Sequence, residues 1–178
     1  HISSQISSVR EVLPGRTYFI PETREKLDPL DYRTEEFVTS VSARPLPLSK
    51  AIYSSFTGIS PLIAEELCHR ASLESDRIAN SFSSQELLHL EHQSALMMES
   101  VRAQQYSPSM ILEDDIPLDC SVLELSQYSD CERQACESVS AMLEQYYARK
   151  NTVTRIRQKS ADLRRVVQTA LDRHCKKY

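Results

Sequence analysis

Glycine is scarce in this chain of 178 residues, which contains only Gly15 and Gly58. A glycine-rich phosphate-binding loop needs several glycines close together, so that class of nucleotide site is excluded. No apolar run approaches the roughly 18 residues of a membrane-spanning helix, and no basic segment followed by an apolar stretch indicates a secretory signal. The G-x-S-x-G nucleophile motif and a supported Cys/His dyad are also missing, so catalysis within these residues has little support.

Metal-binding and disulfide patterns are missing as well. The five cysteines are odd in number and never adopt a C-x-x-C spacing, which favours free thiols in a reducing cytosol over a disulfide framework or a zinc site. His89 and His92 lie one helical turn apart, but the sequence positions no further ligand to complete a metal shell. We therefore expect no metal and no cofactor. The cysteines are Cys68, Cys120, Cys131, Cys136 and Cys175.

Charge is distributed unevenly along the chain, whose net charge is −4. From Met142 to Tyr178 there are ten basic and three acidic side chains, a net charge of +7, so the preceding 141 residues carry −11. Such asymmetry suggests that the basic end contacts something anionic, most often nucleic acid. The alternative is a solvated helix face that forms ion pairs with another helix. The chain also begins at His1 rather than Met, so we interpret it as a segment of a longer protein.

The first third of the chain is irregular and then becomes helical. Residues 1–32 lack sustained periodicity, Pro14-Gly15 predicts a turn, and the stretch RTYFI (16–20) predicts a short strand. Thr34 is the expected N-cap of a short helix with Phe37, Val38 and Val41 on its apolar face. These first residues are interpreted as a segment whose structural partners lie elsewhere.

Two short helices are predicted on either side of Gly58. The first begins at Ser49, and Gly58 is expected at its left-handed C′ position. Ser60 and Pro61 then start the second helix as N-cap and N1, because the missing N–H of proline is harmless in a first turn. The turn is so short that the two helices must pack against each other. The sequence therefore predicts a helix-hairpin-helix corner, which we define as residues 56–61.

The corner is also a candidate contact for nucleic acid. Helix-hairpin-helix modules normally carry two glycines, and backbone N–H groups of the hairpin and the following helix contact phosphate oxygens. Here Ser60 replaces the second glycine and two glutamates follow, which disfavours phosphate, so a purely structural corner remains the alternative. The residues that would form this site are Lys50, Gly58, Ile59, Ser60 and Arg70.

A longer helix and a β-hairpin are predicted next. Ser83 or Ser84 is expected to cap a helix that runs to about Gln105. The period then changes, and YSPSMIL (106–112) and CSVLEL (120–125) predict two strands around the acidic turn EDDIP. Consecutive acids in a turn point in different directions and do not form a carboxylate pair or a metal site. We therefore interpret Glu113 to Asp115 as solvated turn residues. An isolated hairpin is barely stable, so it should pair with strands elsewhere.

The C-terminal part of the chain predicts one long helix. From about Asp130 there is no Pro or Gly, and apolar residues recur in alternating steps of three and four over roughly 45 residues, or about 65 Å. A single stripe of this kind needs a second helix, so the chain is cut inside a coiled coil or self-associates there. The expected stripe is Ala135, Val139, Met142, Tyr146, Arg149, Val153, Ile156, Ser160, Leu163, Val167, Ala170 and His174.

The most concentrated basic stretch lies on that helix, in RIRQKSADLRRVV. Arg157, Arg164 and Arg165 fall off the stripe and are predicted to face outward. One hypothesis is contact with RNA or the ribosome, and the other is pairing with an acidic partner helix. We name the candidate residues the basic segment: Arg155, Arg157, Lys159, Arg164 and Arg165.

Three stretches in this order resemble the NFACT family: SSVREVLPGRTYFIP with KLDPLD, then FTGISPLIAEELCHRA, then SVSAMLEQYYARKNTVTRIRQKSADLRRVV. The resemblance implies a mainly α fold with a small β portion, comprising a helix-hairpin-helix module and a long coiled-coil helix. Residues 1–32 and 106–126 would complete an N-terminal lobe that is otherwise absent, 33–105 would form the module, and 128–178 the first arm of the coiled coil.

The resemblance also implies a role in ribosome-associated quality control, with tRNA and obstructed large ribosomal subunits as partners and support for C-terminal tailing of stalled chains. The Asp-Arg pair that the family uses for tRNA is expected upstream of His1, and Asp76-Arg77 is not its counterpart. The fragment itself is expected to be non-catalytic, in the cytoplasm and without membrane contact. Two alternatives stay open: a fibronectin-binding surface adhesin, and a DNA-binding helix-hairpin-helix protein.

Overall fold

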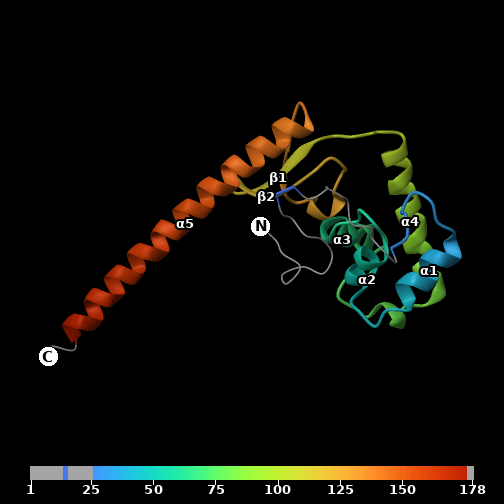
Figure 1. The fold of residues 1–178 in the computed structure, drawn as a ribbon, viewed down its shortest axis with the longest axis horizontal. Coiled ribbons are helices and arrows are strands. Elements are labelled where there is room, and N and C mark those ends of the chain that lie inside the picture. Colours follow the sequence, from blue (N-terminus) through green and yellow to red (C-terminus); the bar gives the residue numbers. More distant parts are fainter. Residues whose placement is uncertain (1–13, 16–25, 176–178) are drawn as a thin grey trace. The chain divides into compact units, whose positions relative to one another are not determined.

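The computed structural model describes residues 14–15 and 26–175. The chain divides into two compact units, His1–Ala95 and Leu96–Tyr178. Figure 1 shows the helices and strands coloured in chain order. The first is helical, and the second combines a three-stranded sheet with one long helix, which confirms the predicted mainly α fold with a small β portion. Pro14-Gly15 does form a turn, with Gly15 at φ +78°, whereas the strand predicted at 16–20 lies outside the described residues.

Helix α1 (Thr34–Ser42) begins one residue earlier than predicted. Arg33, not Thr34, is the N-cap, because its backbone is extended while Thr34 already belongs to the helix. The backbone N–H of Arg33 donates to Glu36 Oε2 over 2.9 Å, so the glutamate in the first turn satisfies the cap. Of the predicted apolar face, Phe37 and Val41 are buried and Val38 is half-buried.

Helices α2 (Leu48–Ser55) and α3 (Pro61–Arg70) form the predicted helix pair and contact each other. Ser60 caps α3, since its Oγ accepts from the backbone N–H of Ile63 over 3.3 Å, and Pro61 occupies N1 as predicted. Gly58 has the expected positive φ of +76°. The prediction that it occupies C′ was wrong by one position, because α2 ends at Ser55 with Phe56 as its C-cap, which makes Thr57 the C′ residue. The helix also starts at Leu48 rather than at the predicted Ser49.

An aromatic cluster lies in the core of the first unit. The rings of Tyr32, Phe37 and Phe56 have centroids 5.1 to 5.6 Å apart in tilted and edge-on arrangements. Leu27 forms a parallel bridge with Phe56 and accepts a hydrogen bond from the backbone N–H of Thr57 over 2.9 Å. The start of the corner is therefore held by a segment about 30 residues upstream in the chain.

A short 3₁₀ turn, η1 (Ala79–Ser81), precedes helix α4 (Ser84–Arg102). Ser83 is the N-cap: its Oγ accepts from the backbone N–H of Glu86, whose carboxylate accepts from the Ser83 backbone N–H over 2.7 Å. Leu87, Leu90 and Met98 are buried, and α4 ends three residues before the predicted Gln105.

The sheet has the order β2-β1-β3 and is antiparallel throughout. Strands β1 (Ser109–Glu113) and β2 (Ile116–Ser121) form the predicted hairpin. The second strand was predicted too late, at 120–125, because Asp114 and Asp115 alone make the turn, with φ of 50° and 63°. Pro117 is accommodated in β2 because that strand lies at the edge of the sheet.

The prediction that the long helix starts near Asp130 was wrong. Glu132–Ala135 forms strand β3, which pairs with β1, so Ala135 does not belong to the helical stripe. A short 3₁₀ turn, η2 (Ser126–Tyr128), precedes β3. Helix α5 (Val139–Cys175) has 37 residues and starts after Ser138, whose Oγ accepts from the backbone N–H of Ala141 over 3.1 Å.

The second unit has its core between the sheet and the first turns of α5. Met110 and Leu112 from β1 pack with Met142 and Tyr146 from α5 in one buried cluster. Val153 is half-buried, and every side chain described beyond it is exposed. The sheet therefore buries the stripe at Met142 and Tyr146, and beyond Val153 every described side chain of the stripe is exposed.

Candidate nucleic-acid interface

The corner presents its backbone on an open surface. Gly58 and Ser60 are exposed, Ile59 is half-buried, and a Cβ at Gly58 would meet nothing within 4 Å. The first turn of α3 has one backbone N–H capped by the Ser60 hydroxyl. The corner thus combines an accessible glycine with a helix N-terminus, whose dipole favours anions.

The two cations predicted at the corner lie at the other ends of their helices. Lys50 is exposed in the first turn of α2, and Arg70 is the last residue of α3, about 14 Å along the helix from Pro61. The Nε of Arg70 donates to Glu66 Oε1 over 2.6 Å, and Glu66 is fully buried. Arg70 therefore compensates a buried carboxylate in the same helix, a role that the sequence pattern did not indicate.

The basic segment lies entirely on the exposed part of α5. All five of its side chains are exposed, and they come from the region beyond Val153, where the sheet no longer covers the helix. Among the side chains that the structure describes, none forms an ion pair with a member of this segment. Arginine and lysine in this state keep their charge available for phosphate or carboxylate groups.

Within the basic segment, helical geometry separates two kinds of position. Arg157 and Arg164 occupy e positions of the heptad and so border the exposed stripe, which includes Ile156 and Leu163. Arg165 lies on the opposite side of the helix from the stripe. All three are exposed, as predicted, but a helix that covered the stripe would contact only the first two.

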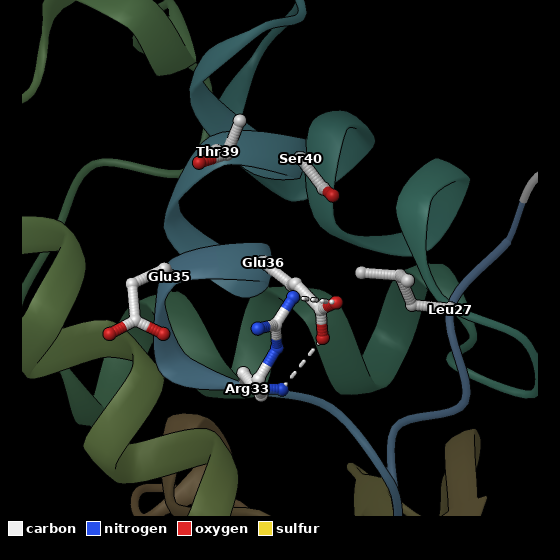
Figure 2. A pocket seen from close by; sticks show the side chains of 6 residues that line it. All are labelled: Leu27, Arg33, Glu35, Glu36, Thr39 and Ser40. Atoms are coloured by element: carbon white, nitrogen blue, oxygen red, sulfur yellow. Dashed lines mark hydrogen bonds and ion pairs between the residues drawn. The ribbon is translucent and has the colours of Figure 1, made fainter.

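A shallow cavity of about 320 Å³ lies beside α1, and the sequence patterns did not indicate it. Figure 2 shows Arg33 reaching Glu36, with its Nη2 2.9 Å from Glu36 Oε1. The side-chain hydrogen bond from Arg33 lowers the pKa of the Glu36 carboxyl. Two glutamates against one arginine make the cavity unfavourable for phosphate. Its lining is Leu27, Arg33, Glu35, Glu36, Thr39 and Ser40.

The described residues contain neither a metal-binding cluster nor a membrane-spanning helix. Cys68, Cys120, Cys131 and Cys136 are free thiols, and His89 and His92 are both exposed. Within the described ranges, no cluster of three or more His, Cys, Asp or Glu side chains could hold a metal ion. None of the described helices combines the length and apolar character needed to cross a membrane.

A family model described as the NFACT N-terminal and middle domains matches residues 1–178. The chain belongs to the NFACT family. This confirms the resemblance that the three sequence stretches indicated. The match covers both units, so the corner and the basic segment lie within the family's N-terminal and middle domains.

Two known proteins are similar to this NFACT chain. The Rqc2 homolog RqcH of Bacillus subtilis (strain 168) is 29% identical over 167 residues, covering 94% of this chain and 27% of RqcH. The crystal structure of the fibrinogen binding protein from Staphylococcus aureus matches with a TM-score of 0.60 at 22% identity, covering 76% of this chain and 46% of that one. The chain thus spans less than half of either protein, and the structural likeness shows a shared fold.

Proposed function

We propose that this chain is a non-catalytic RNA-binding segment of a ribosome-associated quality control factor. Its ligands are tRNA and the obstructed large ribosomal subunit, and the full-length protein supports C-terminal tailing of stalled chains. The observation that carries the proposal is the basic segment: five exposed cations on a helix that no other described element covers at that point. Membership of the NFACT family and similarity to RqcH support the same role.

Binding through the basic segment is electrostatic, so it depends on salt. Each phosphate contact contributes close to one unit to the slope of log K against log salt concentration. Arg157, Arg164 and Arg165 replaced together by Glu should therefore weaken tRNA binding and lower that slope by about 2 to 3. The measurement is a fluorescence-anisotropy titration of labelled tRNA with the full-length protein at several salt concentrations.

The matched control keeps the charge at the same three positions. Arg157, Arg164 and Arg165 replaced by Lys should retain most of the affinity and the salt slope, because phosphate contact at an exposed helix face depends mainly on charge. Equal affinity for the wild type and the Glu variant would contradict the proposal. A duplex DNA that displaces tRNA in competition would favour the DNA-binding alternative instead.

The corner can be tested without disturbing its fold. Aspartate and asparagine both cap helices as well as serine does, so Ser60→Asp and Ser60→Asn should preserve α3. The two variants differ by one negative charge at the helix N-terminus. If backbone N–H groups there contact phosphate, Ser60→Asp weakens tRNA binding and Ser60→Asn does not. Equal binding by both variants would leave the corner a purely structural element.

A further inference from the structure

Helix α5 has a short base, around Met142 and Tyr146, that packs on the sheet. The rest of the helix, from Thr154 to Cys175, forms a long arm. Among the described side chains of α5, Met142 and Tyr146 are the two that are buried, 3% and 5% exposed, and they lie about one turn apart. From Thr154 to Cys175 the helix extends for about 33 Å without support from the sheet. At that length, a tilt of about 10° at the base would move the far end by about 6 Å. The direction of α5 therefore depends on how precisely its base is fixed.

The packed cluster of Met110, Leu112, Met142 and Tyr146 holds the base of α5 on the sheet, but the hydrophobic effect that drives this burial is itself non-directional. The base of α5 has in addition a polar contact that is directional. The hydroxyl of Tyr146 donates to the carbonyl oxygen of Leu118 over 3.3 Å, and it accepts from Lys150 Nζ over 2.9 Å. The same ammonium lies 5.0 Å from the centre of the Tyr146 ring.

The acceptor of this contact lies at an irregularity of the sheet. Ile111 pairs with Asp119 and Leu112 pairs with Pro117, so Leu118 is the extra residue of a β-bulge and has no Cα partner on β1. A bulge interrupts the regular ladder and reorients the strand locally. Here it places the Leu118 carbonyl group where a side chain of α5 reaches it. The bulge in β2 and the tyrosine in α5 thus belong to one arrangement.

We propose that Tyr146, bonded to the Leu118 carbonyl oxygen and braced by Lys150, is the positioning residue that fixes the direction in which α5 leaves the sheet. The inference deepens the proposed function, because α5 carries the basic segment, but the geometry can be measured without RNA. The hydrogen bond to Tyr146 raises the pKa of Lys150.

The test measures a distance across this junction in the full-length protein. Nitroxides are attached through keto-bearing non-natural residues at Glu113 and Thr169, both exposed, which leaves the native cysteines unchanged. Pulsed electron spin resonance then gives the distance distribution between the end of β1 and the arm of α5. Tyr146→Phe removes only the hydroxyl and keeps the buried ring. The distribution should broaden in this variant, and less strongly in Lys150→Met.

Tyr147→Phe is the matched control, because it removes a hydroxyl from the neighbouring tyrosine, which is 55% exposed. It should leave the distribution unchanged. A distribution for Tyr146→Phe as narrow as that of the wild type overturns the proposal, as does equal broadening in both tyrosine variants. Should Tyr146→Phe fail to fold, Lys150→Met decides in the same way.

A second measurement separates this inference from the proposed function. Tyr146→Phe removes no cation, so it should lower tRNA affinity while leaving the salt slope unchanged. If wild-type protein does not bind tRNA, the proposed function fails and the distance measurement still decides the role of Tyr146. If tRNA binds but the distances do not respond to Tyr146→Phe, only the positioning role fails.

Discussion

The turn between α2 and α3 depends on the backbone of a single residue. Gly58 has φ +76°, a conformation that side chains disfavour, although the space around it is open. Gly58→Ala should lower the free energy of unfolding by about 1 to 2 kcal/mol, because an L-residue is strained in the left-handed region. Urea unfolding followed by circular dichroism measures this. Gly58→Asn should cost less, since asparagine tolerates that region, and an Ala variant as stable as the wild type would contradict the prediction.

The thiols differ in reactivity because they differ in burial. Cys68 is 1% exposed, and burial raises the pKa of its thiol to about 12. Since the thiolate is the nucleophile, Cys68 should resist iodoacetamide at neutral pH in the folded protein. Cys131, which is half-buried, should be alkylated faster than Cys68. Peptide mass spectrometry over a time course measures both rates, and labelling of Cys68 as fast as Cys131 would refute the prediction.

At the scale of elements, the start of α4 links stability to pH. The backbone N–H of Ser83 donates to Glu86 and lowers the pKa of its carboxyl. A lowered folded-state pKa means that the stabilisation is present above the ordinary glutamate pKa of 4.5 and is lost as pH falls through the folded value. Glu86→Gln should therefore reduce the loss of stability in acid.

Chemical unfolding of Glu86→Gln at several pH values tests this link. The control is Glu99→Gln, which changes an exposed glutamate near the other end of the same helix. The control should follow the wild-type pH profile. Removing the cap hydroxyl itself, with Ser83→Ala, should cost about 1 kcal/mol at neutral pH, the usual value for an N-cap. Identical acid profiles for the wild type and Glu86→Gln would exclude the cap as a pH-dependent contact.

Elements were predictable where their signals are local. The Ser60-Pro61 start of α3, the Ser83 cap of α4 and the Asp-Asp turn region all follow from residues within one or two helical turns or within the turn itself. Strand β3 was missed because Glu132–Ala135 carries no marked strand pattern and forms only by pairing with β1. Because β3 occupies residues up to Ala135, α5 starts only at Val139 and has 37 residues instead of the roughly 45 predicted.

At the scale of the whole molecule, the second unit should be stable without the arm of α5. All side chains described beyond Val153 are exposed, so that arm contributes no buried apolar area within this chain. Shortening the chain after Val153 should leave its melting temperature unchanged, as measured by scanning calorimetry. Shortening it before Met142 should destabilise the sheet, because Met142 and Tyr146 cover β1. A clear fall in melting temperature for the first truncation would show that the arm packs on the remainder of the chain.

The candidate site was predictable only in part. The exposure of the basic segment followed from its position off the stripe, because the 3.6-residue period fixes which side chains share a face. The role of Arg70 did not follow, because the charged residue Glu66 gives no sign in the sequence that it is buried. The cavity beside α1 was equally hidden, since Leu27 and Ser40 lie on separate segments.

By itself, the sequence determined the corner, the N-caps of α3 and α4 and the position of the positive charge, because capping, left-handed turns and helical periodicity depend on residues close together in the chain. Only the tertiary structure decided where α5 begins, how β1 acquires a second partner, and which residue of α5 meets the bulge at Leu118. Those features arise from contacts between residues distant in the sequence, and no local pattern specifies them.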